Sequence, residues 1–401
     1  MKLRRVPSDN IILIAGAIVF IWILLLPKPV QIGSYYDSIK HASATLKGQT
    51  PFSDFAAEVV GFRALYYKTD PYPVLGPALK GLGIDWNVTL PHSHPPTSYL
   101  FAAPVAFLPW PWASAVWAWL MLGLIVLTYY FYGLSWKKAV GLMPFTLLWP
   151  PASIALGQVT ILWMFGLAMA YYFRRRQPLW SGVSIGLASA TKLFAGIVIG
   201  VFLLKRKWTA VLGFLSIWIV MLGVVSLLNS QALPQYFAIS RPVGLAIIAR
   251  SDNQSPIIVS YRYGGLIGVA FIALLFWLII FANRKYLHER QTFPTTRAWM
   301  ILTYFSVALL PTSYIYALIP LLPVIVFLIS VKKIATTILS LYCILIPCIY
   351  VQGGDQSVLP MASVSWALGL AFILDLLPVK IFQKKWRLNL PTLAGGSFVK
   401  R

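Results

Sequence analysis

Residues 174–207 read RRRQPLWSGVSIGLASATKLFAGIVIGVFLLKRK, two apolar stretches between two basic clusters. The stretches Leu179–Ala190 and Leu193–Leu204 have 12 residues each. Each would form a helix about 18 Å long, which is short for a hydrocarbon core of roughly 30 Å. One continuous span would leave a basic cluster outside, against the tendency of Lys and Arg to stay inside. We therefore predict that the segment enters the membrane, turns at Lys192 and returns.

The composition of the whole chain agrees with a membrane location. Of its 401 residues, 59% are hydrophobic, 15% aromatic and only 11% charged, and the mean hydropathy is +0.76. Soluble domains carry about 25% charged residues, and a soluble fold of this composition would expose too much apolar surface. Disorder is excluded because the chain has ample apolar area to bury. The sequence predicts an all-α polytopic membrane protein, a single integral membrane domain over residues 1–401.

Apolar runs recur along the chain and predict about 12 transmembrane helices, which places both termini on one side. The predicted spans are Ile11–Leu26, Ala113–Phe131, Ala139–Ala155, Val159–Phe173, Leu179–Ala190, Leu193–Leu204, Trp208–Leu228, Ile257–Ala282, Trp299–Pro311, Ile315–Val331, Ile334–Val351 and Met361–Leu377.

The distribution of charge predicts the orientation. With a cytoplasmic N-terminus, the inner segments hold 23 basic and three acidic residues, and the remainder of the chain holds 10 and seven. This is the positive-inside pattern, so the net charge of +23 is expected to face anionic lipid and not nucleic acid. We predict a multi-pass protein of the plasma (inner) membrane with both termini cytoplasmic. Residues 27–97 and 229–256 form two extracytoplasmic loops, and residues 379–401 form a basic cytoplasmic tail.

The first of these loops contains a predicted amphipathic helix. Thr50-Pro51 is a helix-start signal, and it is followed by aromatic and aliphatic residues at spacings of three and four, namely Phe52, Phe55, Val59, Phe62 and Tyr66. This face is expected to lie in the membrane interface.

Asp54 and Glu58 stand four residues apart on the polar face of that helix. One interpretation is a solvated face, with Asp54 favourable in the first helical turn. The other is a functional pair, in which each carboxylate raises the pKa of the other.

His92 and His94 lie in the Pro-rich stretch His92-Ser93-His94-Pro95-Pro96. Histidines can bind metal or transfer protons, and in a turn they also serve as hydrogen-bonded loop residues. No HExxH or CxxC spacing is present, so the sequence predicts no metal site and no cofactor.

Polar residues at membrane depth are further candidates. Lys192, at the apex of the predicted hairpin, is expected below the outer surface, where a lysine is expensive and usually functional; the alternative is snorkelling to the interface. An anionic group such as a phosphate is its expected partner. Gln158 lies in a turn on the same side, where it either caps helix ends or faces the first loop.

The second loop and the helix after it supply Arg241, Arg250 and Arg262 on the outer side. Such a cluster runs against the positive-inside trend, and it indicates either anion recognition or pairing with Asp252 or Asp355.

At these residues the chain resembles glycosyltransferase family 87, a group with the GT-C fold whose named members are polyprenol-phosphate-mannose-dependent α-1,2-mannosyltransferases. The matching motifs are Ser53-Asp54-Phe55, Asp70-Pro71-Tyr72, His94-Pro95-Pro96, Ala103-Pro104, Gly157-Gln158, Ala190-Thr191-Lys192 and Asn253-Gln254-Ser255. The last third is similar only in hydropathy. Where members often carry a histidine near Ser313, this chain has Tyr314 and Tyr316.

The resemblance implies a polyprenyl-phosphate sugar donor, a glycolipid or glycan acceptor, an inverting reaction, and Asp54 as general base. Without the resemblance, Asp54 at the interface can still take a proton from a hydroxyl, and Lys192 with Arg262 can stabilise a departing phosphate. Glu58, His94, Gln158 and Asn253 are expected to line the site.

The alternative is a transporter or flippase of lipid-linked sugars. Such a protein would carry polar residues near the midplane of several helices, whereas here they gather near the outer face.

Overall fold

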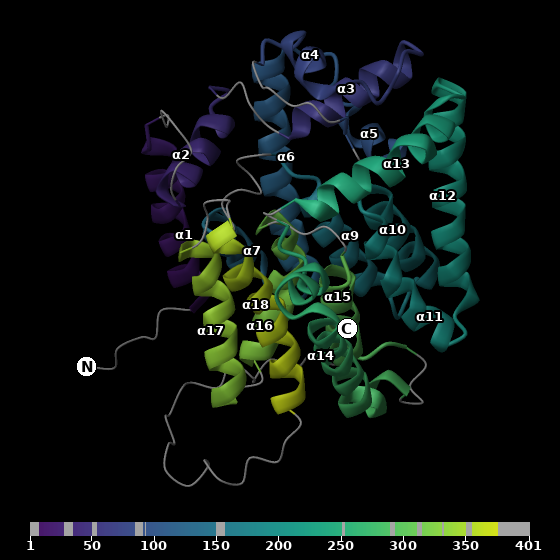
Figure 1. Ribbon diagram of the computed structural model, residues 1–401. Helices are drawn as coiled ribbons and strands as arrows, with labels where there is room; N and C mark the ends of the chain where they lie inside the picture. Colours follow the sequence, from purple (N-terminus) through teal and green to yellow (C-terminus); the bar gives the residue numbers. More distant parts are fainter. Residues whose placement is uncertain are drawn as a thin grey trace, which may run out of the picture.

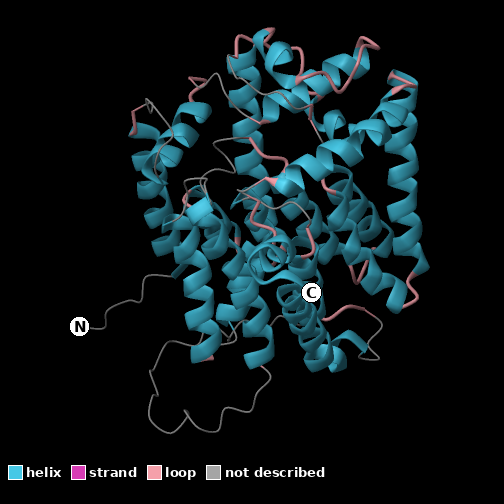
Figure 2. Ribbon diagram, viewed as in Figure 1, coloured by secondary structure: helices cyan, strands magenta, loops and turns pink. Residues whose placement is uncertain are grey.

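The structure is a computed structural model that describes residues 8–27, 35–49, 54–84, 91–92, 94–149, 157–250, 253–288, 293–310, 315–330, 333–349 and 355–375. These residues are mostly helical (Figure 2), and they contain no β-strand beyond one isolated bridge between Val74 and Pro91. The helical class predicted from the sequence is therefore confirmed. The predicted cytoplasmic tail at 379–401, Asp252 and Tyr314 lie outside the described residues, as does the side chain of Tyr316.

The elements of the first half, as labelled in Figure 1, are α1 Ser8–Leu25, α2 Tyr35–Leu46, α3 Phe55–Tyr66, α4 Leu75–Lys80, α5 Pro96–Tyr99, η1 Leu100–Ala102, α6 Trp110–Phe131, α7 Trp136–Leu147, α9 Thr160–Phe173 and α10 Pro178–Thr191. The second half consists of η2 Leu193–Ile199, α11 Gly200–Leu204, α12 Trp208–Leu228, α13 Ala232–Ala249, α14 Pro256–His288, α15 Thr296–Ala308, η3 Ile315–Leu321, α16 Leu322–Ser330, α17 Ile334–Ile349 and α18 Asp355–Leu374.

Three of the described helices, α6, α12 and α14, are long and apolar enough to cross a membrane. Six shorter apolar helices accompany them, and each of the predicted spans coincides at least in part with described helix. The chain is thus a membrane protein, and the count of about 12 spans stays a prediction. α12 has the bounds predicted for that span, whereas α14 is kinked where Gly265 adopts φ 55° and ψ −141°.

The segment that includes Lys192 is broken as the sequence predicts. Lys192 has extended backbone angles, φ −144° and ψ 111°, between α10 and the 3-10 helix η2. α10 packs against η2, so the chain turns back at this lysine. Arg206 adopts φ 52°, in the left-handed region, where the chain leaves α11 and enters α12.

Small residues allow α10 and α12 to pack closely. A Cβ atom on Gly182 would lie 1.7 Å from the carbonyl oxygen of Ala210, and one on Gly213 would lie 2.2 Å from that of Leu179. These contacts fix α10, and with it the position of Lys192 at its end.

α3 is more deeply buried than an amphipathic interfacial helix. It lies with α4 and α5 at one end of the molecule, near the ends of α6, α12 and α13 (Figure 1). Phe55 stacks on Trp117 of α6, with 4.0 Å between ring centroids, and nine of the 12 residues of α3 are buried. The interpretation of Glu58 as part of a solvated face is wrong, because this side chain is only 2% exposed.

Candidate active site

Asp54 sits at the start of α3, and its side chain does not cap the helix that it precedes. The described helix begins at Phe55, so Asp54 occupies the N-cap position and not the first turn. The carboxylate instead accepts a hydrogen bond from Nε2 of Gln158, 104 residues further along the chain. Gln158 is buried, and the preceding Gly157 has φ +64° while its carbonyl oxygen accepts a hydrogen bond of 2.9 Å from Nε1 of Trp117. α6 therefore anchors the turn that presents Gln158 to Asp54.

The environment of Asp54 suits a proton acceptor. The pKa of its carboxyl is raised to about 6, chiefly by burial and in smaller part by the nearby negative charge of Glu58. The hydrogen bond from Gln158 and the positive charge of Lys192 act in the opposite direction. A pKa near 6 leaves the carboxylate ionised at neutral pH and more basic than an ordinary aspartate, which is the range useful for general-base catalysis.

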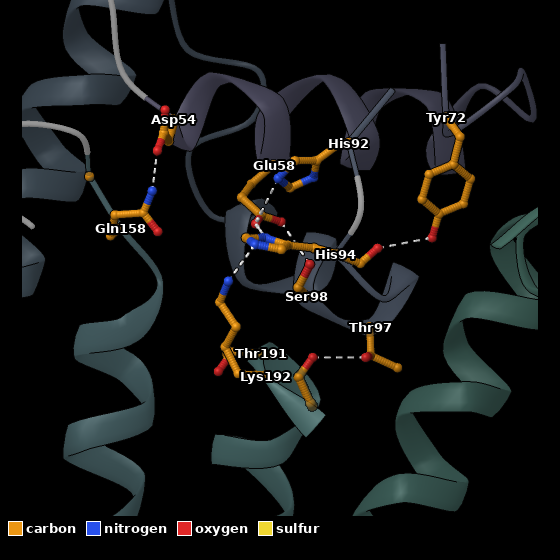
Figure 3. Close-up of polar contacts among 12 residues, drawn as sticks. Asp54, Glu58, Tyr72, His92, His94, Thr97, Ser98, Gln158, Thr191 and Lys192 are labelled. Carbon is orange, nitrogen blue, oxygen red and sulfur yellow. Dashed lines mark hydrogen bonds and ion pairs between the residues drawn. The ribbon is translucent and has the colours of Figure 1, made fainter. Parts of the chain in front are cut away.

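Glu58, His94 and Lys192 form a chain of short hydrogen bonds (Figure 3). Nζ of Lys192 lies 2.8 Å from Nε2 of His94, and Nδ1 of His94 lies 2.5 Å from Oε1 of Glu58. An ammonium group only donates, so Nε2 accepts and the proton of the neutral imidazole resides on Nδ1, where it is donated to Glu58. The other carboxylate oxygen of Glu58 accepts a hydrogen bond of 2.8 Å from Ser98.

Backbone contacts hold this chain of residues in place. Oη of Tyr72 donates to the carbonyl oxygen of His94 at 3.2 Å. Oγ1 of Thr97, in α5, donates to the carbonyl oxygen of Ala190 at 2.9 Å. The second contact joins the first loop to the end of α10, two residues before Lys192.

Burial determines the protonation of the other groups. It raises the pKa of Glu58, lowers that of His92 to about 3, and lowers that of His94 well below its ordinary value. The adjacent positive charge of Lys192 contributes to the lowering of both imidazole pKa values, and the negative charge of Glu58 opposes it at His92. Both histidines are consequently neutral at physiological pH.

Five of the seven predicted site residues are thus brought together, namely Asp54, Glu58, His94, Gln158 and Lys192. The two remaining residues have their described contacts elsewhere. Asn253 accepts a hydrogen bond of 3.0 Å from the amide of Ser255, in the turn that precedes α14. Arg262 is exposed, and its Nη2 donates to the carbonyl oxygen of Arg250 at 2.6 Å.

Two further residues lie beside Glu58: Ser98, which the sequence does not indicate, and His92, which the sequence offers without placing it in the site. Ser98 holds Glu58, and a ring nitrogen of His92 lies 3.9 Å from Oε1 of Glu58. The position of His92, two residues from the predicted site residue His94, could have indicated that it belongs to the site. Nothing in the sequence indicates a role for Ser98, because a serine beside a Pro-rich turn has many ordinary roles. Ligand-type atoms of Glu58, His92 and His94 all lie within 4.8 Å of one another, close enough for a metal ion.

Buried and partly buried acids, imidazoles and a lysine that perturb one another's pKa values are typical of an enzyme's active site, and here they lie in a helical membrane protein. Residues 93–313 match the family model described as glycosyltransferase family 87. The match covers more than half of the chain, which therefore belongs to glycosyltransferase family 87 and is a membrane glycosyltransferase. No curated protein and no solved structure shows significant similarity to it.

The matched range includes His94, Gln158 and Lys192 but begins after Asp54 and Glu58. The case for these two carboxylates accordingly rests on their position in this structure.

Proposed function

We propose that this protein transfers a hexose, mannose-like, from a polyprenyl-phosphate donor to a glycolipid or glycan acceptor on the extracytoplasmic face of the plasma membrane. The main support for the proposal is that a partly buried carboxylate, Asp54, interacts electrostatically with Lys192, which lies at the tip of the α10–η2 hairpin. Gln158 orients the carboxylate, and His94 positions the lysine. A base and a cation at the end of a membrane helix match what a lipid-phosphate sugar donor requires.

Asp54 is the proposed general base. Its carboxylate removes the proton from the acceptor hydroxyl as the oxygen attacks the anomeric carbon of the donor sugar. Gln158 holds one carboxylate oxygen, which leaves Oδ1 for the hydroxyl. Attack on the face opposite the phosphate inverts the configuration at that carbon.

Lys192 is the proposed contact for the leaving group. The bond between the anomeric carbon and the phosphate oxygen breaks, and negative charge develops on the departing polyprenyl phosphate. An ammonium group has three donor positions, and His94 accepts one of them. The other two are available to phosphate oxygens, where a positioned cation stabilises the transition state. Glu58 orients His94 and, in this proposal, does not touch the sugar.

The proposal is tested with the purified protein in liposomes that contain a polyprenyl-phosphate donor labelled in the sugar, together with a lipid extract as the source of acceptors. The expected result is label in a new glycosidic product, with release of unlabelled polyprenyl phosphate. Movement of the intact labelled donor across the bilayer without a new glycosidic bond would contradict the proposal and favour a flippase.

A further inference from the structure

The cluster of Glu58, His92 and His94 contains a side chain that the proposed reaction does not use. Nδ1 of His92 is buried and has no hydrogen-bond partner among the described residues. The ring also lies against His94, with centroids 4.1 Å apart. Leaving a buried polar atom without a partner is unfavourable by about 1–3 kcal/mol. The other ring nitrogen, Nε2, lies 3.9 Å from Oε1 of Glu58, which is near the carboxylate but too far for a hydrogen bond.

Glu58, His92 and His94 together have the geometry of a three-ligand metal site, with Nε2 of His92 3.9 Å and Nδ1 of His94 2.5 Å from Oε1 of Glu58. One carboxylate oxygen and two imidazole nitrogens lie within 4.8 Å of one another. In a tetrahedral zinc site, ligand atoms about 2.1 Å from the metal are about 3.4 Å apart. To reach that spacing, the 2.5 Å distance between Glu58 and His94 must lengthen, and the longer distances among the three ligand atoms must shorten. Side-chain rotations can provide changes of this size.

The chemistry of the ligand set selects the metal. Two nitrogens and one carboxylate oxygen suit zinc and neighbouring transition metals, and not calcium or magnesium. Neutral imidazole is the form of histidine that binds metal. Ser98 already holds the second oxygen of Glu58 at 2.8 Å, an outer-sphere hydrogen bond of the kind that orients metal ligands.

We propose that Glu58, His92 and His94 form a binding site for a divalent transition metal, with zinc as its best occupant, and that occupation excludes the contact between Lys192 and His94. A metal ion on Nδ1 of His94 places the imidazole proton on Nε2, which then cannot accept from the ammonium of Lys192. The dication also repels that ammonium directly. Metal and lysine therefore compete for one histidine.

This competition gives two variants with opposite expected effects. His92→Gln removes a ligand and should weaken zinc binding by about tenfold or more, since loss of even an outer-sphere partner typically weakens it 10–100-fold. Lys192→Met removes the competitor and should tighten zinc binding by about tenfold or more, because repulsion between a dication and a nearby ammonium group exceeds the roughly 1.4 kcal/mol of a tenfold change. His41→Gln changes another buried histidine, on α2, and should leave zinc affinity unchanged.

The measurement is zinc affinity of the full chain, purified without a polyhistidine tag and stripped with a chelator, by competition with a fluorescent zinc indicator. Elemental analysis gives the stoichiometry, which is expected to be one zinc per chain, and the rise in thermal stability with zinc gives an independent readout. Neither depends on glycosyl transfer, so this test and that of the proposed function succeed or fail separately.

Tighter binding in Lys192→Met together with weaker binding in His92→Gln supports the proposal, and misfolding cannot produce that pair. Equal affinity in wild type and His92→Gln would overturn it, as would X-ray absorption of the zinc-loaded protein showing no imidazole ligands. Unchanged or weaker binding in Lys192→Met would overturn the competition.

Discussion

Replacing Gln158 with methionine should move the pH dependence of transfer without abolishing transfer. Gln158 donates to the Asp54 carboxylate and so favours its charged form. Hydrogen bonds to charged groups contribute about 1.5–3 kcal/mol. Because this carboxyl is partly exposed, we take the lower end of that range, which corresponds to a rise of about one pKa unit. The pKa of Asp54 is about 6 in the wild type and is thus expected near 7 in Gln158→Met.

The magnitude follows from the fraction of Asp54 that is ionised. At pH 6 about half of the wild-type carboxyl is charged, against roughly a tenth in Gln158→Met, so kcat/KM for the acceptor should fall about fivefold. At pH 8.5 both proteins are almost fully ionised and the difference should largely disappear. In each protein activity rises with pH through the pKa of Asp54, because the base acts in its deprotonated form.

The assay is transfer from labelled donor at low acceptor concentration, between pH 5 and pH 9. Recovery at high pH serves as the internal control for folding, and Gln177→Met, at the opposite end of α10 from Lys192, serves as the matched control. A profile for Gln158→Met with the wild-type midpoint and a uniformly lower plateau would refute the reasoning, since Gln158 would then not act through the ionisation of Asp54.

Three further predictions concern charge and packing. Lys192→Met should lower the rate of transfer by about 10²-fold, as expected for loss of one positioned donor to a transition-state charge, whereas wild-type kinetics would remove Lys192 from the site. Gly182→Ala should lower the unfolding temperature, because overpacking costs about 1–3 kcal/mol. Gly223→Ala on α12 should not lower it, because a Cβ atom there would have no neighbour within 4 Å. Equal melting curves for the two variants would contradict the close packing of α10 and α12. Asp375→Ala should destabilise the protein by about 3–5 kcal/mol, because the buried Asp375 pairs with Arg297 and removing one partner of a buried ion pair is strongly destabilising. Unchanged stability in denaturant would show that the pair contributes nothing.

The hairpin at Lys192 was predictable because its evidence is local. Two short apolar stretches between basic clusters allow few arrangements in a bilayer, and the structure breaks the helix at that lysine. The bounds of α12 were predictable for the same reason, since the apolar run begins after Lys207 and ends at the polar residues Asn229, Ser230 and Gln231.

The environment of Glu58 was not predictable. Its position four residues after Asp54 indicates a helix face but does not say what covers that face. The covering groups, His94 and Ser98, lie 36 and 40 residues away in the sequence, and their approach depends on how the Pro-rich stretch folds back over α3. His92 and His94 were considered as metal ligands, but their sequence spacing matches no metal motif, and the approach of Glu58 to both histidines appears only in the fold.

The contact between Asp54 and Gln158 was predictable only in part. Both residues were selected from the sequence, the first as a base and the second as a polar residue in a turn facing the same side. Their pairing across 104 residues depends on α6 anchoring the Gln158 turn, which only the packing of Trp117 reveals.

The most direct test of the account is transfer by Asp54→Asn, measured beside binding of the polyprenyl-phosphate donor. Asparagine preserves the size of the side chain but cannot take a proton from the acceptor. We expect transfer to fall by about 10²–10⁴-fold, the usual contribution of a general base, with donor affinity nearly unchanged. Wild-type transfer by this variant would contradict the assignment of Asp54 as the base.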